Sequence, residues 1–330
     1  MPAWLVFVLS AAAVAGGGIR LARDGDVIAE ETGLGGMWVG AILVAAATSL
    51  PELATDANAI LQGYPGLAVG DLFGSCMANM AILAVADLLT RKARMLTRVA
   101  INQALVGVLA ICLMIVAAVG VLAGSDRGLL SFGPAVLVIG LVYIAGMRLL
   151  HVNRGAPPFR PPEEVPEPKP GRPRLRRAVI GFGVAALFIF VAAPSLARST
   201  AEIAAAIGIR EGFAGLLFLA ITTSLPEAAV SYAAVRKGWY DLAVGNLLGS
   251  SCFNMAALIP LDVLEGPGAL LGAVDPALAV GALFAVLLTG LAVLDILNKS
   301  EHRVGIIEPG PALMLVAYVV GLVVTYRVAH

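Results

Sequence analysis

Charged side chains are scarce in this sequence. They make up 13% of its 330 residues, against roughly 25% in an average soluble protein. Hydrophobic residues account for 59%, and the mean hydropathy is +0.92. A water-soluble fold would leave too much of this apolar surface exposed, so the composition excludes a soluble protein and indicates one that lies in a lipid bilayer.

Histidine and cysteine are also rare, with three of each. All cysteines fall inside apolar runs and all histidines outside them: Cys76, Cys112, Cys252 and His151, His302, His330. This distribution argues against a disulfide framework or a zinc site. It also leaves the buried serines without a histidine base, and no aspartates stand in a GxGD context, which excludes an intramembrane protease. We expect a protein that is not an enzyme and that needs no cofactor.

Long hydrophobic runs, by contrast, are abundant. A spanning helix needs about 20 mostly apolar residues, and ten such runs can be read directly from the sequence. They are Trp4–Leu21, Gly35–Leu61, Leu67–Leu89, Val99–Ala123, Leu129–Leu150, Ala178–Leu196, Gly212–Val235, Leu242–Leu261, Pro276–Leu294 and Ile306–Tyr326. The sequence therefore predicts an all-α membrane protein with ten transmembrane helices.

Lys and Arg are distributed unevenly between the loops that join these spans. With the N-terminus outside, 18 of the 22 basic residues fall on the inner side, as the positive-inside rule requires. The four on the outer side are Arg127, Arg198, Arg210 and Arg327. We therefore predict a multi-pass protein of the cell membrane with both termini outside and the central loop in the cytoplasm.

Residues 151–177 divide the chain into two halves that repeat one another. This segment is rich in Pro, Arg and Glu, which predicts a semi-extended, solvated linker. TSLPELATDANAILQGYPGLAVGDLFGSCMANM begins at Thr48 and TSLPEAAVSYAAVRKGWYDLAVGNLLGSSCFNM at Thr223, an offset of 175 residues without a gap. The halves, residues 1–150 and 178–330, hold five spans each, so the second enters the membrane from the opposite side. Inverted repeats of this kind are typical of secondary transporters, whose binding site lies where the repeats meet.

Two acidic residues, Glu52 and Glu227, each lie within an apolar span. A carboxylate at the bilayer centre costs roughly 2.5 kcal/mol or more, which makes each a candidate functional residue; the alternative is a protonated, purely structural pair. The proline before each glutamate interrupts the helix and frees backbone carbonyl groups near Thr48 and Thr223. Ca²⁺ takes about six to eight oxygen ligands from carboxylates, carbonyls and water. The two segments supply oxygens of these kinds.

The second segment of each repeat adds neutral oxygens. Ser75 and Asn79 are four residues apart and share a helical face, as do Ser250 and Asn254. Hydroxyl and amide oxygens suit Na⁺, whose single charge requires no further carboxylate. Glycines at small-xxx-small spacing let both helices approach their neighbours closely; they are Gly70, Gly74, Gly245 and Gly249.

The duplicated TSLPE and GSxxxN motifs in a ten-span chain resemble the two internal repeats of the cation/calcium exchanger superfamily, close to its prokaryotic Na⁺/Ca²⁺ members. The resemblance implies that Glu52 and Glu227 hold Ca²⁺ together with the carbonyls of Thr48 and Thr223. It also implies Na⁺ sites lined by four serine side chains and two alanine carbonyls. These residues are Ser49, Ser75, Ser224, Ser250, Ala45 and Ala220, and the neutral amides of Asn79 and Asn254 complete the expected set.

Several acidic and amide positions bear on this interpretation. The family's usual asparagine after the first glycine is Asp71 here, which is expected to point toward the mouth of the pathway. Asp56, one turn after the first glutamate, has Ser231 as its counterpart. Asp87, near the end of a span, is expected at the membrane interface. Asn254 stands where K⁺-dependent members have Asp, so exchange is expected to be insensitive to K⁺.

We interpret the chain as a secondary antiporter that exchanges Ca²⁺ for Na⁺ by alternating access. Ca²⁺/H⁺ antiport by the same fold is the alternative, with the two glutamates and Asp56 or Asp71 accepting protons. A passive cation channel would use the same oxygens, but inverted repeats favour a transporter. The expected partners are the two ions and membrane lipid, without nucleic acid or a protein partner. The sequence leaves the coupling ion, stoichiometry, direction of transport and oligomeric state open.

Overall fold

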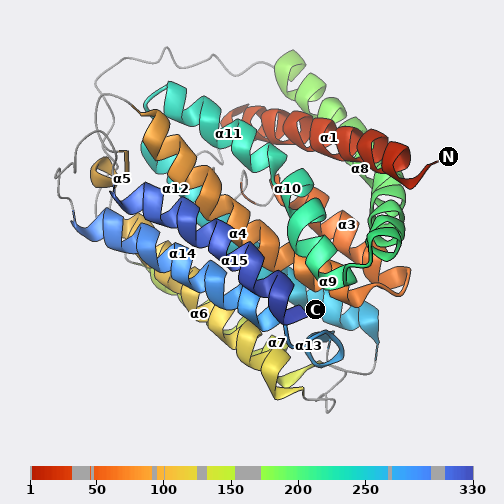
Figure 1. Ribbon diagram of the computed structural model, residues 1–330. Helices are drawn as coiled ribbons and strands as arrows, with labels where there is room; N and C mark the ends of the chain where they lie inside the picture. The colour runs from red at the N-terminus through yellow and green to blue at the C-terminus, as the bar shows by residue number, and fades with distance from the viewer. Residues whose placement is uncertain are drawn as a thin grey trace.

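The structure, a computed structural model, describes residues 2–31, 45, 48–90, 95–99, 101–124, 132–152, 172–266, 270–298 and 309–329. Within these ranges the regular secondary structure is helical and there is no strand (Figure 1). The helices are α1 (Ala3–Glu31), α3 (Leu50–Leu61), α4 (Pro65–Leu89), α5 (Met95–Arg98), α6 (Ile101–Ala123), α7 (Pro134–Val152), α8 (Arg172–Ile207), α9 (Glu211–Ala214), η1 (Gly215–Leu219), α10 (Ala220–Thr223), α11 (Leu225–Arg236), α12 (Tyr240–Glu265), α13 (Leu270–Ala273), α14 (Leu278–Asn298) and α15 (Pro309–Ala329).

Seven of the described helices are long and apolar enough to cross a membrane, and a bent pair over residues 211–236 makes an eighth. The apolar part of α7, Pro134–Leu150, is shorter. In the predicted span Gly35–Leu61 the structure describes α3, while residues 32–44 lie outside the described ranges. The chain is therefore an all-helical, multi-pass membrane protein, and the count of ten spans stays a prediction.

The central helices are α4 and α12, most of whose residues are buried. Helices α6, α7, α14 and α15 pack on one side of this centre (Figure 1). On the other side α1 packs along α8, and this pair meets the centre through α3, α10 and α11. The two segments that contain the repeated glutamates thus lie between the α1–α8 pair and the central helices.

Helix α8 is longer than the apolar run that predicts it. It covers Arg172–Ile207, whereas the hydropathy predicts Ala178–Leu196. The prediction of an extended linker is wrong for residues 172–177, which form the first turns of this helix. Hydropathy marks only the part of a helix that suits lipid, and the backbone hydrogen bonds continue into the polar flank. Residues 153–171 of the linker lie outside the described ranges.

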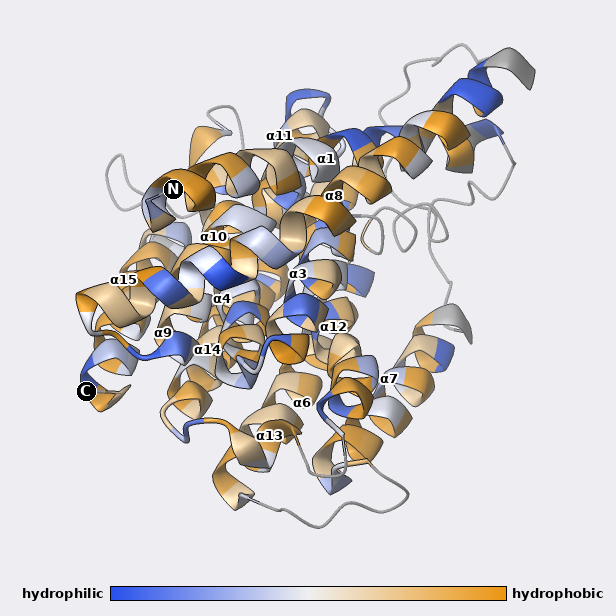
Figure 2. Ribbon diagram, turned by 90° about the vertical axis from the view of Figure 1, so that its right-hand side faces the viewer, coloured by the Kyte–Doolittle hydropathy of each residue, from blue (hydrophilic) through white to orange (hydrophobic). Residues whose placement is uncertain are grey.

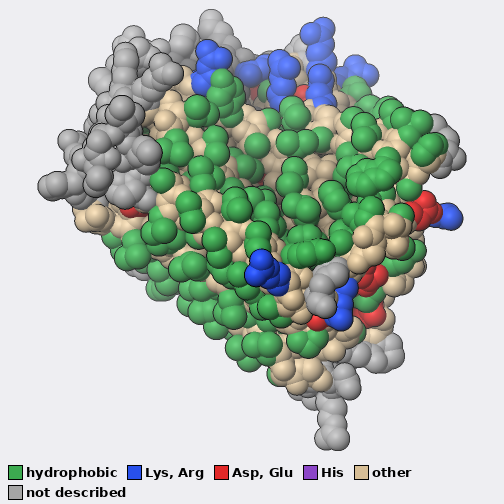
Figure 3. All heavy atoms as spheres, in the orientation of Figure 1, with side chains coloured by type: hydrophobic (Ala, Val, Ile, Leu, Met, Phe, Trp, Pro, Cys, Tyr) green, Lys and Arg blue, Asp and Glu red, His purple; other side chains and the backbone are tan. Residues whose placement is uncertain are grey.

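The outer surface is strongly apolar, as the composition predicts. Figure 3 shows a broad band of hydrophobic side chains below an edge along which Lys and Arg gather. Leu141, Ile144 and Val191 are 68–70% exposed. In water this exposure would be costly, whereas in a bilayer such side chains contact lipid chains.

Two buried aspartates end the central helices. Asp87 Oδ1 accepts hydrogen bonds from the backbone N–H groups of Met95 (2.6 Å) and Leu96 (3.2 Å). Asp262, its counterpart in the 175-residue repeat, accepts one from Leu270 N–H at 2.7 Å. Asp87 is 1% exposed and thus buried within the protein, and its depth at the membrane interface stays a prediction. Each carboxylate satisfies N–H groups at the start of a short helix, which have no acceptor within that helix.

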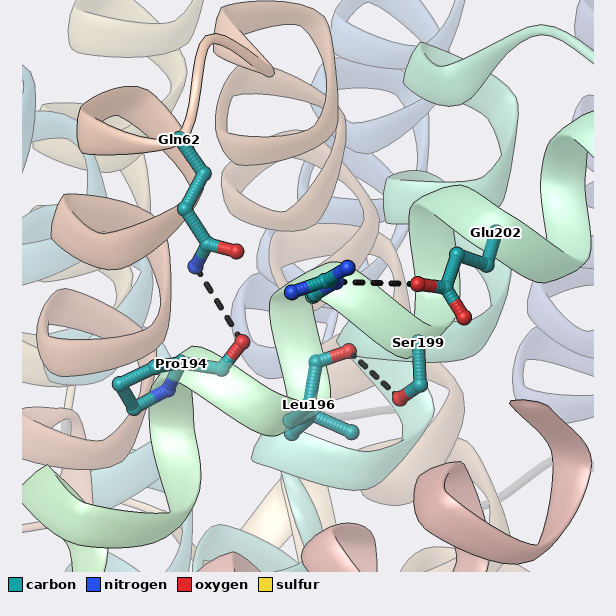
Figure 4. Close-up of polar contacts among 6 residues, drawn as sticks. Gln62, Pro194, Leu196, Ser199 and Glu202 are labelled. Atoms are coloured by element: carbon teal, nitrogen blue, oxygen red, sulfur yellow. Dashed lines mark hydrogen bonds and ion pairs between the residues drawn. The ribbon is translucent and has the colours of Figure 1, made fainter. Parts of the chain in front are cut away.

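Gln62 joins the end of α3 to the middle of α8 (Figure 4). Its Nε2 donates hydrogen bonds to the carbonyls of Asn58 (3.1 Å) and Pro194 (3.2 Å). Pro194 lies inside α8 and offers no N–H of its own. The helix that contains Glu52 is therefore tied at its far end to the α1–α8 pair.

Candidate cation-binding site

A break in the helix precedes each repeated glutamate. Ser49 (φ −89°, ψ 4°) and Ser224 (φ −80°, ψ 3°) adopt nearly the same non-helical conformation. The helices that follow, α3 and α11, carry proline in their first turn, where a missing N–H loses no helical hydrogen bond. The second break bends the chain by 43°. The predicted interruptions beside the prolines are therefore present, with the serine as the interrupted position.

The segment before the second break contains a feature that the sequence did not predict. Residues Gly215–Leu219 form a π-helical turn, a distortion that is frequent at functional sites. This segment lies backbone to backbone with α4: a Cβ on Gly70 would overlap the carbonyl oxygen of Gly212, and one on Gly74 would overlap that of Leu216. The predicted close approach at the first pair of glycines is confirmed, and it brings α4 against the chain that leads to Glu227.

Equivalent residues of the two halves form hydrogen bonds across the boundary between the halves. Thr48 Oγ1 lies 3.3 Å from Ser250 Oγ, and Thr223 Oγ1 lies 3.5 Å from Ser75 Oγ. An offset of 175 relates the two threonines and, likewise, the two serines. All four side chains are fully buried. Residues that are far apart in the sequence are thus brought together in reciprocal pairs at the centre of the molecule.

Glu227 is held by serines from two different segments. Its Oε1 accepts hydrogen bonds from Ser49 Oγ at 3.2 Å and from Ser250 Oγ at 3.3 Å. Its other oxygen has no hydrogen-bond partner among the described residues. The carboxylate is therefore oriented on one side, and its second oxygen is available to a ligand.

Glu52 is buried as deeply but is not held in this way. The residue is 1% exposed, and neither of its carboxylate oxygens has a partner in the described part of the chain. Its carboxyl group lies near enough to those of Glu227 and Asp71 for negative charges to repel. Buried, unpaired carboxylates are costly unless a proton or a cation neutralises them.

Asp71 occupies a different place from the one predicted. It is fully buried, and its Oδ1 accepts hydrogen bonds from Thr223 Oγ1 at 3.1 Å and from Ser75 Oγ at 3.5 Å. The prediction that it points toward the mouth of the pathway is therefore wrong. Asp56 is also fully buried, and its carboxyl group lies close enough to that of Asp71 for the two to share a hydrogen bond, with Glu52 nearby.

The counterparts of these two aspartates are neutral. Asn246 Nδ2 donates to Ser231 Oγ at 3.2 Å, where the first half has Asp71 and Asp56. The Oδ1 of Asn246 lies 3.5 Å from Thr48 Oγ1, which matches the contact between Asp71 and Thr223. Sequence reasoning did not assign Asn246 to the site, although its position in the repeat opposite Asp71 could have indicated it.

The remaining predicted residues are buried but make fewer contacts with one another. The carbonyls of Ala45 and Ala220 accept the N–H groups of Ser49 (3.0 Å) and Ser224 (3.1 Å). The Ala45 carbonyl also accepts Thr48 Oγ1 at 3.0 Å, so both of its lone pairs are engaged. The hydroxyl of Ser224 has no partner among described residues.

The two predicted amides behave differently. Asn79 Nδ2 donates to Ser251 Oγ at 3.4 Å, whereas neither polar atom of Asn254 has a partner among the described residues. Asn254 is 1% exposed, and a buried amide normally makes hydrogen bonds. Its amide group is thus available to a ligand or to water.

The described residues contain no group of three or more His, Cys, Asp and Glu side chains placed to share a metal ion. A site built here would therefore combine the carboxylates of Glu52 and Glu227 with neutral oxygens. Carbonyls, hydroxyls and water are usual ligands of Ca²⁺ beside carboxylates. The ion would be transported cargo and not a resident cofactor.

Comparison with known proteins identifies relatives over most of the chain. CaxA of Alkalimonas amylolytica is 29% identical over 280 residues, which cover 82% of this chain and 84% of the relative. The inner membrane protein YrbG of Escherichia coli is 31% identical over 253 residues, with 76% and 75% covered. The sodium/calcium exchanger MaX1 of Methanosarcina acetivorans is 27% identical over 291 residues, with 80% and 83% covered.

Solved structures and a family model complete the comparison. The match to the crystal structure of the H⁺/Ca²⁺ exchanger CAX covers 100% of this chain and 85% of the exchanger chain, with a TM-score of 0.76 and 16% identity. The sodium-calcium exchanger NCX_Mj matches 97% and 98%, with a TM-score of 0.62 and 21% identity. These identities show a shared fold. Residues 2–149 and 177–327 match the model of the sodium/calcium exchanger protein family, and the chain belongs to that family.

Proposed function

We propose that the chain is a secondary antiporter that exchanges Ca²⁺ for Na⁺ by alternating access. The observation that carries this proposal is the pairing of Glu52 and Glu227, two buried carboxyl groups close enough for their negative charges to repel when both are ionised, each of which follows a helix break. A divalent cation between them would remove the repulsion. The backbone carbonyls of Thr48 and Thr223, with water, would complete its oxygen shell.

The Na⁺ sites would use the neutral oxygens of the same region. In this proposal Na⁺ and Ca²⁺ compete, since the two carboxylates cannot neutralise Ca²⁺ and a full set of Na⁺ ions together. The Na⁺ ligands would be the side chains of Ser49, Ser75, Ser224 and Ser250, the carbonyls of Ala45 and Ala220, and the amides of Asn79 and Asn254. The Ala45 carbonyl already accepts two hydrogen bonds, so it would have to lose one of them to bind an ion. Na⁺ binding would therefore be accompanied by a change in the hydrogen bonds around Thr48 and Ser49.

The proposed framework is two inverted five-helix repeats, residues 1–150 and 178–330, joined by residues 151–177. The reciprocal contacts Thr48–Ser250 and Thr223–Ser75 support it, because an approximate twofold axis would generate one from the other. The two separate family matches also support these boundaries. We place the protein in the cell membrane with both termini outside and the central segment in the cytoplasm, acting on ions without a cofactor, enzymatic activity or protein partner.

Exchange of Ca²⁺ for H⁺ is the second candidate, and the first half of the site favours it. Asp56 and Asp71 add two buried carboxyl groups beside Glu52. None of these acids forms an ion pair with another described residue. Protons could neutralise them when Ca²⁺ leaves. Because the solved structures of this fold include both an H⁺/Ca²⁺ and a sodium-calcium exchanger, the fold is compatible with either counter-ion.

Reconstitution separates the two candidates. Uptake of radioactive Ca²⁺ into proteoliposomes is measured with a Na⁺ gradient alone, with an H⁺ gradient alone, and with neither. We expect the Na⁺ gradient to drive uptake; uptake driven only by the H⁺ gradient would reject the Na⁺ proposal, and uptake without either gradient would indicate a channel. The same assay is applied to Glu52→Gln. Its control is Glu202→Gln, which changes an exposed acidic residue far along α8.

A paired substitution sharpens the choice of counter-ion. Asp56→Ser combined with Asp71→Asn gives the first half the Ser231–Asn246 arrangement of the second. We expect Na⁺-driven exchange to continue in this variant. Loss of all H⁺-driven uptake with intact Na⁺-driven uptake would assign proton binding to the two aspartates, whereas loss of both would place them in the Ca²⁺ site itself.

A further inference from the structure

A cavity of about 490 Å³ opens between the ends of α1 and α8. Its polar lining consists of Arg20, Arg23 and Asp24 from α1 and Arg174 and Arg177 from α8. None of these residues belongs to the cation site. The volume is far larger than the roughly 30 Å³ that one water molecule occupies in the liquid, so the cavity has room for a polar group of several atoms.

Buried carboxylates fix part of this arginine cluster. Arg20 Nε pairs with Asp24 at 2.7 Å, and Arg174 pairs with Glu31 at 3.1 Å. The acidic side chains are 8% and 3% exposed. Helix α8 comes close enough that a Cβ on Gly181 would overlap a carboxylate oxygen of Asp24. Among the side chains that the structure describes here, four guanidinium groups face two carboxylates, so the described lining is net positive.

An apolar stripe runs along α8 away from the arginines. It follows Arg177 at helical spacing, and its side chains are 53–70% exposed. The stripe consists of Ile180, Val184, Leu187, Phe188 and Val191. Figure 2 shows the polar first turns of α8 passing directly into hydrophobic ones. A ligand that satisfies both regions carries an anionic group joined to hydrocarbon chains.

We propose that this cavity binds the headgroup of an anionic phospholipid whose acyl chains lie along the stripe. Arginine forks bind phosphate oxygens in pairs, and basic pockets between membrane helices on the cytoplasmic side bind anionic headgroups. The positive-inside distribution places the cavity on that side. In Figure 3 the basic side chains gather along one edge of the apolar band, where headgroups would lie.

The site has a short connection to the helix breaks. Gly18 of α1, two residues before Arg20, lies against the rings of both Pro51 and Pro226. A Cβ on Gly18 would overlap the Pro226 ring and come within 2.9 Å of Pro51 Cγ. A headgroup that fixes the end of α1 would therefore also restrain the turns that precede both glutamates. We expect exchange to be faster or slower with anionic lipid than without it; this consequence rests on the proposed function, whereas the binding does not.

The binding test uses the purified full-length protein, delipidated in detergent and titrated with phosphatidylglycerol or phosphatidylcholine of identical chains. Native mass spectrometry counts the bound lipids. We expect phosphatidylglycerol to bind more tightly, and Arg23→Ala with Arg177→Ala to weaken it by about 30-fold, since each arginine near the headgroup contributes to binding. Arg198→Ala is the matched control: Arg198 lies on the same helix, its side chain is 72% exposed, and it pairs with Glu202.

Several outcomes would overturn the proposal. Equal affinity for both lipids would do so, as would equal loss in the Arg198→Ala control. Competition by glycerol phosphate at the same concentration as the lipid would assign the cavity to a small soluble anion. Lipid binding that emerges only after Glu163, Glu164 and Glu167 are changed to Gln would assign it to the chain's own linker. Arg23→Lys with Arg177→Lys, which keeps the charge, tests folding: it should retain part of the phosphatidylglycerol affinity and the wild-type melting temperature.

Discussion

The two halves of the candidate site share a helix break at equivalent serines and differ in side-chain chemistry. Ser49 and Ser224 break their helices with nearly equal dihedral angles, and each half contributes one glutamate. In the second half Glu227 is held by two serine hydroxyls, and Asn246 donates to Ser231. In the first half Glu52 has no partner among the described residues: Ser75, the counterpart of Ser250, donates to Asp71, and the hydroxyl of Ser224, the counterpart of Ser49, is also without a described partner.

The difference shows how a duplicated scaffold can present two unlike sides to a bound ion. Ser250 donates a hydrogen bond to Glu227, whereas its counterpart Ser75 donates one to Asp71. One carboxylate is thus oriented before an ion arrives, whereas no hydrogen bond from a described residue orients the other. The substitutions below are arranged to break this comparison, from the largest expected effect to the smallest.

Replacing either glutamate with glutamine should have the largest effect. We expect Glu52→Gln and Glu227→Gln each to reduce Ca²⁺ exchange by about 100-fold or more, because losing a residue that only hydrogen-bonds a metal ligand already costs roughly 10- to 100-fold. Radioactive Ca²⁺ flux in proteoliposomes measures this, with thermal unfolding in detergent as the check on folding. Wild-type flux in a folded variant would remove that residue from the site.

Glycine substitutions test whether equivalent helices of the two halves pack equally closely against their neighbours. A Cβ on Gly70 would overlap backbone of the opposing segment, whereas one on its counterpart Gly245 would lie 3.2 Å from the flexible side chain of Gln103. We expect Gly70→Ala to destabilise the protein by about 1–3 kcal/mol or more and Gly245→Ala to have little effect. Melting temperatures in the same detergent test this, and equal shifts would show that the packing difference is unimportant.

The repeat-equivalent serines test whether only one glutamate is oriented. Ser250→Ala removes a hydrogen bond to a carboxylate of the proposed Ca²⁺ site, so the Ca²⁺ concentration for half-maximal exchange should rise about tenfold. Ser75→Ala removes a donor to Asp71 instead and should change it much less. If Ser75→Ala has the larger effect, Asp71 and not Glu227 is the carboxylate whose orientation controls affinity.

The amide pair should give the smallest effect. Asn254→Asp adds a carboxylate at a buried position whose amide has no described partner, and we expect slightly tighter retention of cations and slower turnover. Asn79→Asp, in which the amide already contacts Ser251, is the matched variant. Wild-type exchange should be unchanged when K⁺ replaces choline; a requirement for K⁺ would contradict this and make Asp56 or Asp71 the additional carboxylate.

Much of the helical framework follows from the sequence because hydropathy reports directly on contact with lipid. The breaks near the two glutamates also follow, since proline cannot donate within a helix. The π-helical turn at Gly215–Leu219 could not be predicted. It lies where α4 comes closest to this segment, and that approach is a property of the assembled molecule.

The site was predictable as a set of residues but not as a set of contacts. The repeat identified Thr48, Ser250 and their equivalents, yet nothing in either segment says which side chain meets which. Asp71 illustrates this: its helical face allows it to point toward an opening or toward Thr223, and only tertiary packing decides. The contacts of Asp87 could not be predicted for a related reason, because the N–H groups that donate to its carboxylate lie in a short helix with no hydropathy signal.

The reciprocal Thr48–Ser250 and Thr223–Ser75 contacts have an evolutionary consequence if the halves are inverted copies. Each half contains one of the threonines and one of the serines, but each threonine contacts the serine of the other half. An unduplicated ancestor would therefore have made these contacts only as a homodimer of oppositely inserted subunits. In such a dimer every mutation changes both subunits at once. After gene fusion the two copies could mutate separately, so that one could acquire Asp56 and Asp71 while the other kept Ser231 and Asn246. A site with two chemically different sides could then be inherited in one chain.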